Sequence, residues 1–145
     1  MIMGSCLCGS VVFELDPAGI VLTTQCYCEN CRKVSGSESG VYLQVKPQSF
    51  RWLAGDDNVA THESSPGNRR GFCQTCGCVA PVQTNYGAVR VPAGALDADP
   101  GIKPNAVLYS SSRAGWCAND APEHSFTDAG PQDFWRKALM RLYTG

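Results

Sequence analysis

Charge, histidine and long apolar runs are all scarce in this chain of 145 residues. Its 12 Lys and Arg residues nearly balance its 13 Asp and Glu residues, and only 17% of its residues are charged, against an average of about 25%. A chain without a basic excess lacks the electrostatic footprint of a nucleic-acid-binding protein. No stretch approaches the roughly 18 consecutive apolar residues of a membrane-spanning helix. We therefore expect neither nucleic acid nor a membrane as a partner.

The start of the chain also lacks the features of an export signal. Residues 1–6 contain no basic side chain, and no apolar run of about 7–15 residues follows them. We therefore expect a cytoplasmic protein whose cysteines stay reduced.

Nine of the 145 residues are cysteine, about 6%, which is below the roughly 8–10% of small disulfide-rich scaffolds. The odd number also excludes complete pairing within one chain.

The length predicts a single domain, residues 1–145, whose core is large enough to need no covalent cross-links. Short segments of alternating apolar and polar residues predict a mainly β fold. Val11, Phe13 and Leu15, for example, fall on one face of such a segment. The expected strands are residues 10–15, 20–25, 41–45, 50–53, 59–64, 70–72, 79–84, 88–92 and 106–109.

One helix is expected at the end of the chain, over residues 130–143. Pro131 suits the first turn of a helix, and Gly145 follows the last turn. The apolar side chains between them recur at helical spacing and predict one face packed on the sheet. These residues are Phe134, Trp135, Ala138, Leu139 and Leu142.

Seven of the nine cysteines lie in three tight clusters, and these clusters predict metal binding. Alternate residues of a strand share one face, so a C-x-C pair can offer two thiolates to one ion. A C-x-x-C pair does the same through a turn. Zinc is the expected metal, because it is redox-inert and accepts four thiolates in a tetrahedron. The clusters are Cys6 and Cys8, then Cys26, Cys28 and Cys31, then Cys73 and Cys76.

Other interpretations apply to single residues rather than to the clusters. Cys78 and Cys117 stand outside the regular spacings and are interpreted as buried, apolar side chains. A redox-active C-x-x-C pair would need a βαβ context, which the pattern lacks, and an iron–sulfur cluster is the remaining alternative to zinc. His62 is expected at the surface of a strand, and His124 in a loop.

Seven cysteines divide into a group of four and a group of three. Four thiolates close a zinc site and make it structural, whereas three protein ligands leave a position for water or substrate. Cys26, Cys28 and Cys31 form the natural open group, because one short loop would supply all three. The sequence by itself does not fix this pairing.

The clusters and their flanking residues resemble one known family. Residues 4–9, 26–37, 71–77 and 94–97 carry its motifs in the same order. The resemblance is to the glutathione-dependent formaldehyde-activating enzyme family, also called the centromere-protein-V/GFA domain, and it covers residues 3–116. It implies a zinc-stapled Mss4-like (β-tent) fold with two Zn²⁺ ions. Cys6, Cys8, Cys73 and Cys76 would hold the structural ion, and Cys26, Cys28 and Cys31 the open one.

The resemblance also implies an activity. The expected enzyme is a carbon–sulfur lyase similar to S-(hydroxymethyl)glutathione synthase, which joins glutathione and formaldehyde. Ser35, Gly36 and Ser37 follow the open group and are expected to present backbone N–H groups to a ligand. The sequence does not identify a catalytic acid or an oligomeric state. A non-catalytic zinc-stapled binding module is the alternative.

Basic residues near the cysteines are interpreted as charge compensation for the thiolates. Binding of glutathione carboxylates is the alternative role. These residues are Arg32, Lys33, Arg69 and Arg70.

Overall fold

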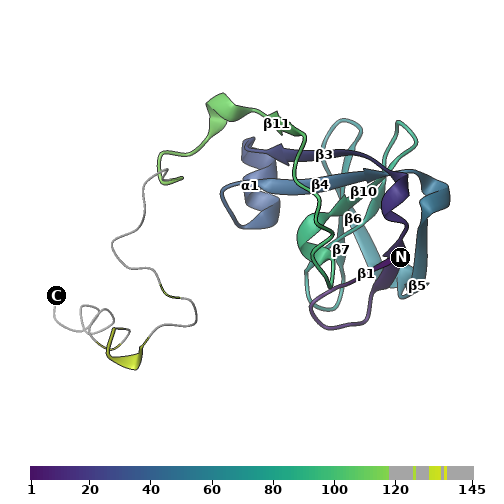
Figure 1. The fold of residues 1–145 in the computed structure, drawn as a ribbon, viewed down its shortest axis with the longest axis horizontal. Helices are drawn as coiled ribbons and strands as arrows, with labels where there is room; N and C mark the ends of the chain where they lie inside the picture. The colour runs from purple at the N-terminus through teal and green to yellow at the C-terminus, as the bar shows by residue number, and fades with distance from the viewer. Residues whose placement is uncertain (118–125, 127–130, 135, 137–145) are drawn as a thin grey trace. The chain divides into compact units, whose positions relative to one another are not determined.

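A computed structural model describes residues 1–117, 126, 131–134 and 136. The chain forms two compact units, residues 1–114 and residues 115–145, which are described separately below. All strands found among the described residues lie in the first unit (Figure 1).

The first unit is built from three antiparallel sheets, with one parallel strand added to the largest. The sheet orders are β1-β2-β5, β11-β3-β4-β10-β9 and β6-β7-β8, and only β11 pairs in parallel, with β3. The mainly β prediction is therefore confirmed. The strands are β1 (Ile2–Ser5), β2 (Val12–Leu15), β3 (Ile20–Cys26), β4 (Gly40–Val45), β5 (Phe50–Ala54), β6 (Val59–Ser65), β7 (Asn68–Cys73), β8 (Val79–Ala80), β9 (Val82–Gln83), β10 (Val89–Pro92) and β11 (Ala106–Leu108).

The core lies between β2 and the central strands of the large sheet. Val11, Phe13 and Leu15 are only 1%, 1% and 0% exposed, as their alternation predicts. Phe13 and Leu15 belong to one apolar cluster with Leu43 and Val45 of β4. The predicted inward face of residues 10–15 is therefore confirmed.

The first strand makes close contact with this core through a glycine. A Cβ atom on Gly4 would lie 2.2 Å from Cζ of Phe13 and 2.6 Å from the backbone oxygen of Ala95. The ring of Phe13 in turn stacks on Phe50 at 5.5 Å and meets Trp52 edge-on at 6.0 Å. Any side chain larger than hydrogen at position 4 would displace this aromatic group.

Strand β4 is buried on both faces, which alternation alone does not reveal. Leu43 and Val45 face the core, whereas Tyr42 and Gln44 are also buried and line a cavity on the other side. The strand pairs with β3 on one side and β10 on the other. Its second face therefore forms the floor of the site described below.

The largest departure from the predicted elements is a helix between β3 and β4. Helix α1 (Glu29–Ser35) begins after Cys28, whose Sγ accepts the backbone N–H of Cys31 at 3.4 Å. It ends at Gly36, which has a φ of 61°. The prediction that a single loop supplies three cysteines is wrong in this respect, because Cys28 caps α1 and Cys31 lies within it.

Two smaller differences concern short elements. Residues 79–84, predicted as one strand, form β8 and β9 with Pro81 between them, and proline has no N–H to continue a ladder. Strand β1 was not predicted. The first unit, which is described throughout, also contains five single-turn 3₁₀ helices: η1 (Pro17–Gly19), η2 (Pro47–Ser49), η3 (Asp56–Asn58), η4 (Ala93–Ala95) and η5 (Ser110–Ser112).

The second unit is described at only a few positions. Gln132–Phe134 and Arg136 are helical, in agreement with the predicted C-terminal helix, whose other residues lie outside the described part of the chain. Cys117 is half-buried. His124 lies outside the described residues.

Candidate metal centres and the adjoining cavity

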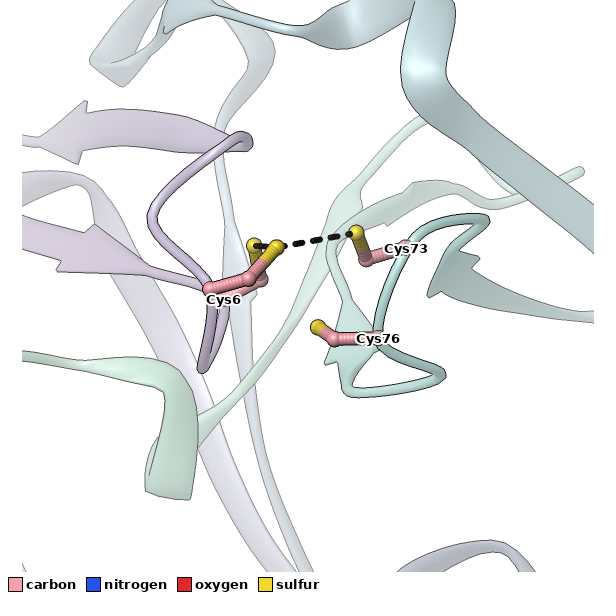
Figure 2. A group of neighbouring side chains, drawn as sticks. Cys6, Cys73 and Cys76 are labelled. Atoms are coloured by element: carbon pink, nitrogen blue, oxygen red, sulfur yellow. Dashed lines mark hydrogen bonds between the residues drawn. The ribbon is translucent and has the colours of Figure 1, made fainter.

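Four of the predicted ligands come together between two turns that belong to different sheets. Cys6 and Cys8 lie in the turn after β1, whereas Cys73 ends β7 and Cys76 lies in the turn after it. Figure 2 shows the labelled side chains of Cys6, Cys73 and Cys76 directed toward one space. The four sulfurs all lie within 4.8 Å of one another. The separation along the chain between Cys8 and Cys73 is 65 residues.

In each turn, the N–H of a glycine donates to the carbonyl of the first cysteine, three residues back in one turn and four in the other. Gly9 N–H donates to the Cys6 carbonyl at 2.9 Å, and Gly77 N–H donates to the Cys73 carbonyl at 2.8 Å. Both glycines have positive φ, 75° and 72°, a conformation that costs glycine little. Each turn therefore folds back on its first cysteine and presents two sulfurs on one side.

The sulfur spacing fits a tetrahedral zinc ion. With Zn–S distances of about 2.3 Å, neighbouring sulfurs of a tetrahedron lie roughly 3.8 Å apart. The observed Sγ–Sγ distances are 3.5 Å between Cys6 and Cys8 and 3.9 Å between Cys8 and Cys73. Cys6 and Cys73 are buried. The four cysteines could therefore form a closed site.

Polar neighbours favour the thiolate form of Cys6 in this group. Burial acts against the charged form of Cys6, but the backbone N–H of Val11 and the hydroxyl of Ser10 lower its pKa to about 6. Val11 N–H lies 3.3 Å from Cys6 Sγ. Ser10 Oγ lies 3.1 Å from Cys8 Sγ and 3.3 Å from Cys73 Sγ.

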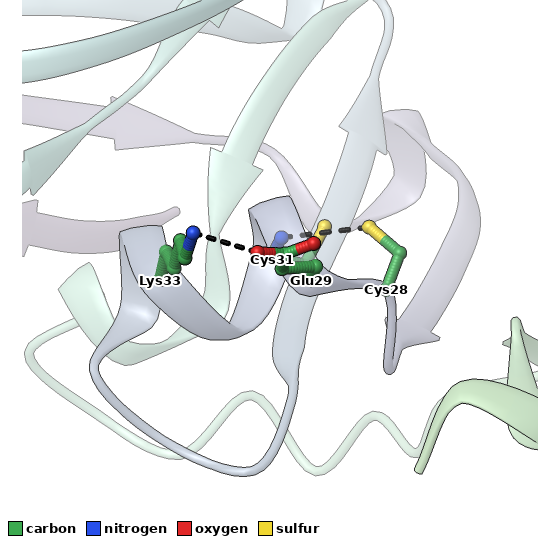
Figure 3. A network of polar contacts seen from close by, with 4 residues as sticks. All are labelled: Cys28, Glu29, Cys31 and Lys33. Atoms are coloured by element: carbon green, nitrogen blue, oxygen red, sulfur yellow. Dashed lines mark hydrogen bonds and ion pairs between the residues drawn. The ribbon is translucent and has the colours of Figure 1, made fainter. Parts of the chain in front are cut away.

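The other three cysteines gather around the start of α1. Cys26 ends β3, Cys28 caps the helix and Cys31 lies in its first turn, and their sulfurs also lie within 4.8 Å of one another. Figure 3 shows the Cys28–Cys31 contact beside the exposed ion pair between Glu29 and Lys33, 2.6 Å long. Only three cysteine sulfurs meet here among the described residues. The group therefore matches an open site.

The electrostatic surroundings differ within the triplet. Burial, reinforced by the neighbouring sulfurs, raises the pKa of Cys26 to about 12 in the metal-free chain. Burial also acts on Cys28, but the backbone N–H of Cys31 and the charge of Arg70 lower the pKa of its thiol below the usual value. A bound cation would remove the proton from a coordinating thiol outright.

The triplet forms one wall of a cavity of about 640 Å³. This volume is within the range of roughly 300–1,000 Å³ that is typical of small-molecule sites. Tyr42 and Gln44 of β4 contribute to the floor, and Arg70 and Arg90 contribute from β7 and β10. The remaining lining residues are Leu22, Thr24, Glu29, Asn30, Ser65, Asn68, Tyr86, Leu108, Tyr109 and Ser112.

A segment from near the end of the first unit closes one side of the cavity. Arg32 of α1 donates to the backbone oxygens of Tyr27, at 3.2 Å, and of Ser112. The guanidinium of Arg113 lies 4.4 Å from the ring centroid of Tyr27. Tyr109 has a φ of 55°, which is unusual for a residue other than glycine. Contacts from both arginines therefore hold residues 109–113 beside the triplet.

A family comparison agrees with this geometry. The model of the family described as "Glutathione-dependent formaldehyde-activating enzyme" (GFA) matches residues 1–112. The chain belongs to the GFA family. A search of curated proteins finds no match.

The fold is also similar to that of a solved structure. A crystal structure of a Rhodobacter sphaeroides protein, determined as a structural-genomics target, aligns with a TM-score of 0.59 at 20% sequence identity. The alignment covers 74% of this GFA-family chain and 100% of the other. Among the described residues, no helix has both the length and the apolar character needed to cross a membrane.

The residues predicted to hold a ligand, 35–37, do not line the cavity. The hydroxyl of Ser35 donates to the Cys31 carbonyl at 2.8 Å, and that of Ser37 donates to the Ser39 carbonyl at 2.6 Å. Neither residue, nor Gly36 between them, lines the cavity. Their role in cofactor binding stays a prediction.

The remaining predicted residues occupy the following places. His62 lies exposed on β6, as expected. Cys78 is half-buried against the four-cysteine group but belongs to neither group of sulfurs. Of the four basic residues near the cysteines in the sequence, only Arg70 lines the cavity. The other three are Arg32, Lys33 and Arg69.

Sequence reasoning missed the other polar residues around the two centres. Arg90 had one available signal, since it is the only charged residue in the apolar strand Val89–Pro92. Tyr42 and Gln44 alternate with the core residues Leu43 and Val45, so alternation alone does not place them at a site. Ser10 follows Cys8 by two residues, whereas Asn58 lies beside the four-cysteine group only because distant turns meet there.

Proposed function

We propose that this GFA-family protein is a zinc-dependent carbon–sulfur lyase of the S-(hydroxymethyl)glutathione synthase type. It would join a thiol such as glutathione to formaldehyde. The single observation that carries the proposal is the position of the Cys26, Cys28 and Cys31 sulfurs on the wall of a cavity of about 640 Å³.

The two cysteine groups would have different tasks. Cys6, Cys8, Cys73 and Cys76 have the donor set and spacing of a closed structural zinc site. Cys26, Cys28 and Cys31 would hold a second zinc and leave one position for the substrate. When bound there, zinc would keep an entering thiol in its nucleophilic thiolate form.

The reaction needs no oxidant or reductant. A bond forms between the thiol sulfur and the carbon of formaldehyde, and the carbonyl π electrons move to the oxygen. The thiol proton finally resides on this oxygen, so that the product carries an S-hydroxymethyl group. The cavity would hold the rest of the thiol beside the triplet and so reduce the entropic cost of the encounter.

The test compares zinc content and activity in matched variants. Zinc per chain is measured in the wild-type protein, in Cys28→Ser and in Cys78→Ser, whose thiol belongs to neither group. Glutathione–formaldehyde exchange is followed in each by NMR. We expect two zinc ions and exchange in wild type and Cys78→Ser, and one zinc ion without exchange in folded Cys28→Ser.

The outcome separates an enzyme from a binding module. Two zinc ions in the wild-type protein without exchange above the uncatalysed rate would overturn the formaldehyde assignment and favour a non-catalytic zinc-stapled module. A single zinc ion in the wild-type protein would overturn the proposed open site.

A further inference from the structure

Two arginines share one aromatic side chain inside the cavity. The guanidinium groups of Arg70 and Arg90 lie 5.8 Å and 5.7 Å from the ring centroid of Tyr42. Both are partly buried and line the cavity. The two side chains come from different sheets, so the fold brings together two positive charges that the sequence separates by 20 residues.

Neither arginine has a carboxylate partner among the described residues. Arg70 donates to Ser64 Oγ at 3.1 Å and to Cys31 Sγ at 3.7 Å. Arg90 donates to the backbone carbonyl of Arg69. Glu29 lines the same cavity, but it forms its ion pair with Lys33.

The positive charges of Arg70 and Arg90 exceed the negative charge that the zinc-bound triplet would supply beside them. Burial and the neighbouring charge of Arg70 both lower the pKa of Arg90. Three thiolates on Zn²⁺ would sum to a charge of −1, which the contacting Arg70 can offset. The charge of Arg90 would remain in a partly desolvated site, where an anion would stabilise it.

A neutral donor adjoins the same space. Gln44 is 8% exposed and lines the cavity. Its side-chain oxygen accepts the hydroxyl of Tyr86 at 2.8 Å. No hydrogen bond of its amide N–H group joins another described residue, so this group is suited to meet an oxygen of a ligand.

We infer that Arg90, with Arg70 beside it, binds a carboxylate of the substrate and makes the cavity selective for acidic thiols. The term "substrate" rests on the proposed function, but carboxylate binding does not. Arg70 contacts Cys31 of the triplet and lies over the same Tyr42 ring as Arg90. A thiol that reaches the cysteines can therefore also present its carboxylate to Arg90. A guanidinium suits this role because its N–H groups can meet both oxygens of a carboxylate.

The binding test uses a ligand that cannot react. S-methylglutathione keeps both carboxylates but has no thiol, and its dimethyl ester removes their charges. Each is titrated calorimetrically into the zinc-loaded full chain. Wild type, Arg90→Gln, Arg90→Lys and Arg69→Gln are compared, the last being a matched control because Arg69 is the exposed neighbour of Arg70 on β7.

We expect Arg90→Gln to weaken binding of the acid about 10–100-fold, the scale of a charged hydrogen-bonded contact. Arg69→Gln should bind like the wild type, and Arg90→Lys should fall between. The ester should bind wild type and Arg90→Gln equally. Equal zinc content in all variants would show that the cysteine groups are intact.

Three results would overturn the inference: equal binding of acid and ester by the wild type, undiminished binding of the acid by Arg90→Gln, or no binding of the acid at millimolar concentration. The wild-type comparison stays decisive even if Arg90→Gln does not fold. Arg90-dependent binding without glutathione–formaldehyde exchange would reject the proposed function and leave the carboxylate site standing. Glutathione–formaldehyde exchange combined with undiminished binding of the acid by Arg90→Gln would reject the carboxylate site and leave the proposed function standing.

Discussion

The side-chain amide of Asn58 donates a hydrogen bond to Sγ of Cys73 over 3.5 Å. The same nitrogen lies 2.9 Å from Ser10 Oγ, which contacts further sulfurs of the four-cysteine group. Groups that hydrogen-bond metal ligands orient them and tune their affinity for the metal. Asn58 thus connects η3 to a centre formed by two other turns.

The first prediction concerns this contact. Asn58→Ala should lower the affinity of the four-cysteine group for zinc by about 10–100-fold, the usual effect of losing such a partner. Competition with a chromophoric chelator measures the change. Asn85→Ala, at an exposed position, is the control, and equal affinities in the two variants would contradict the prediction.

The two cysteine groups should contribute unequally to stability. Cys76→Ser breaks a link between turns of different sheets, whereas Cys31→Ser affects a group confined to residues 26–31. A structural zinc supplies about 10–16 kcal/mol of apparent binding energy in zinc-finger peptides. We therefore expect Cys76→Ser to lose its cooperative thermal transition, and Cys31→Ser to keep one.

Circular dichroism during heating, combined with zinc analysis, measures this difference. Cys78→Ser, which leaves both groups intact, should retain the wild-type transition. A cooperative transition near the wild-type temperature in Cys76→Ser would refute the structural assignment of that group.

Position 4 should tolerate glycine alone. A Cβ there would lie 2.2 Å from Phe13 and 2.6 Å from a backbone oxygen, and crowding of this kind in a core costs about 1–3 kcal/mol. Gly4→Ala should therefore lower the free energy of unfolding by that amount in urea denaturation. Gly94→Ala, where a Cβ meets nothing within 4 Å, should change it by about 0.5 kcal/mol or less.

The contacts of Arg32 should protect the neighbouring wall of the cavity. Arg32→Ala removes the donor to the Tyr27 and Ser112 carbonyls, and hydrogen bonds from charged groups contribute about 1.5–3 kcal/mol. Amide hydrogen exchange in residues 105–112 should become about tenfold faster or more. Lys33→Ala, which removes only an exposed ion pair, should leave this exchange unchanged.

The strands and the cysteine groups were predictable because they depend on local patterns. Val11, Phe13 and Leu15 alternate along the predicted strand 10–15, and their burial follows from that spacing. The spacings of the seven clustered cysteines likewise predicted two sets of ligands. The count of seven suggested a division into four and three, but the choice of clusters for each group required either the family resemblance or the fold, since it depends on which turns meet.

Helix α1 was not predicted, for two physical reasons. It has seven residues, too few to display helical periodicity, and Cys31 is its single buried residue. Its N-terminal cap is the thiol of Cys28 instead of the usual Ser, Thr, Asp or Asn. The signals that usually mark a helix were therefore absent.

The polar wall of the cavity could not be predicted from neighbours in the sequence. Arg70, Arg90 and Tyr42 belong to three strands, and two different sheets bring them together. Charge within an apolar strand suggests that Arg90 has a role, but only the fold reveals a shared site, because β10 pairs with β4 and Arg70 of β7 lies over the Tyr42 ring.

The two cysteine groups also become complete at different times during synthesis. Cys31 completes the triplet, whereas the other group must wait for Cys76, 45 residues later. At the usual roughly 5–20 residues per second, this interval lasts about 2–9 s. The triplet is therefore the first full set of thiols that the nascent chain offers to a metal, while Cys6 and Cys8 still await their partners.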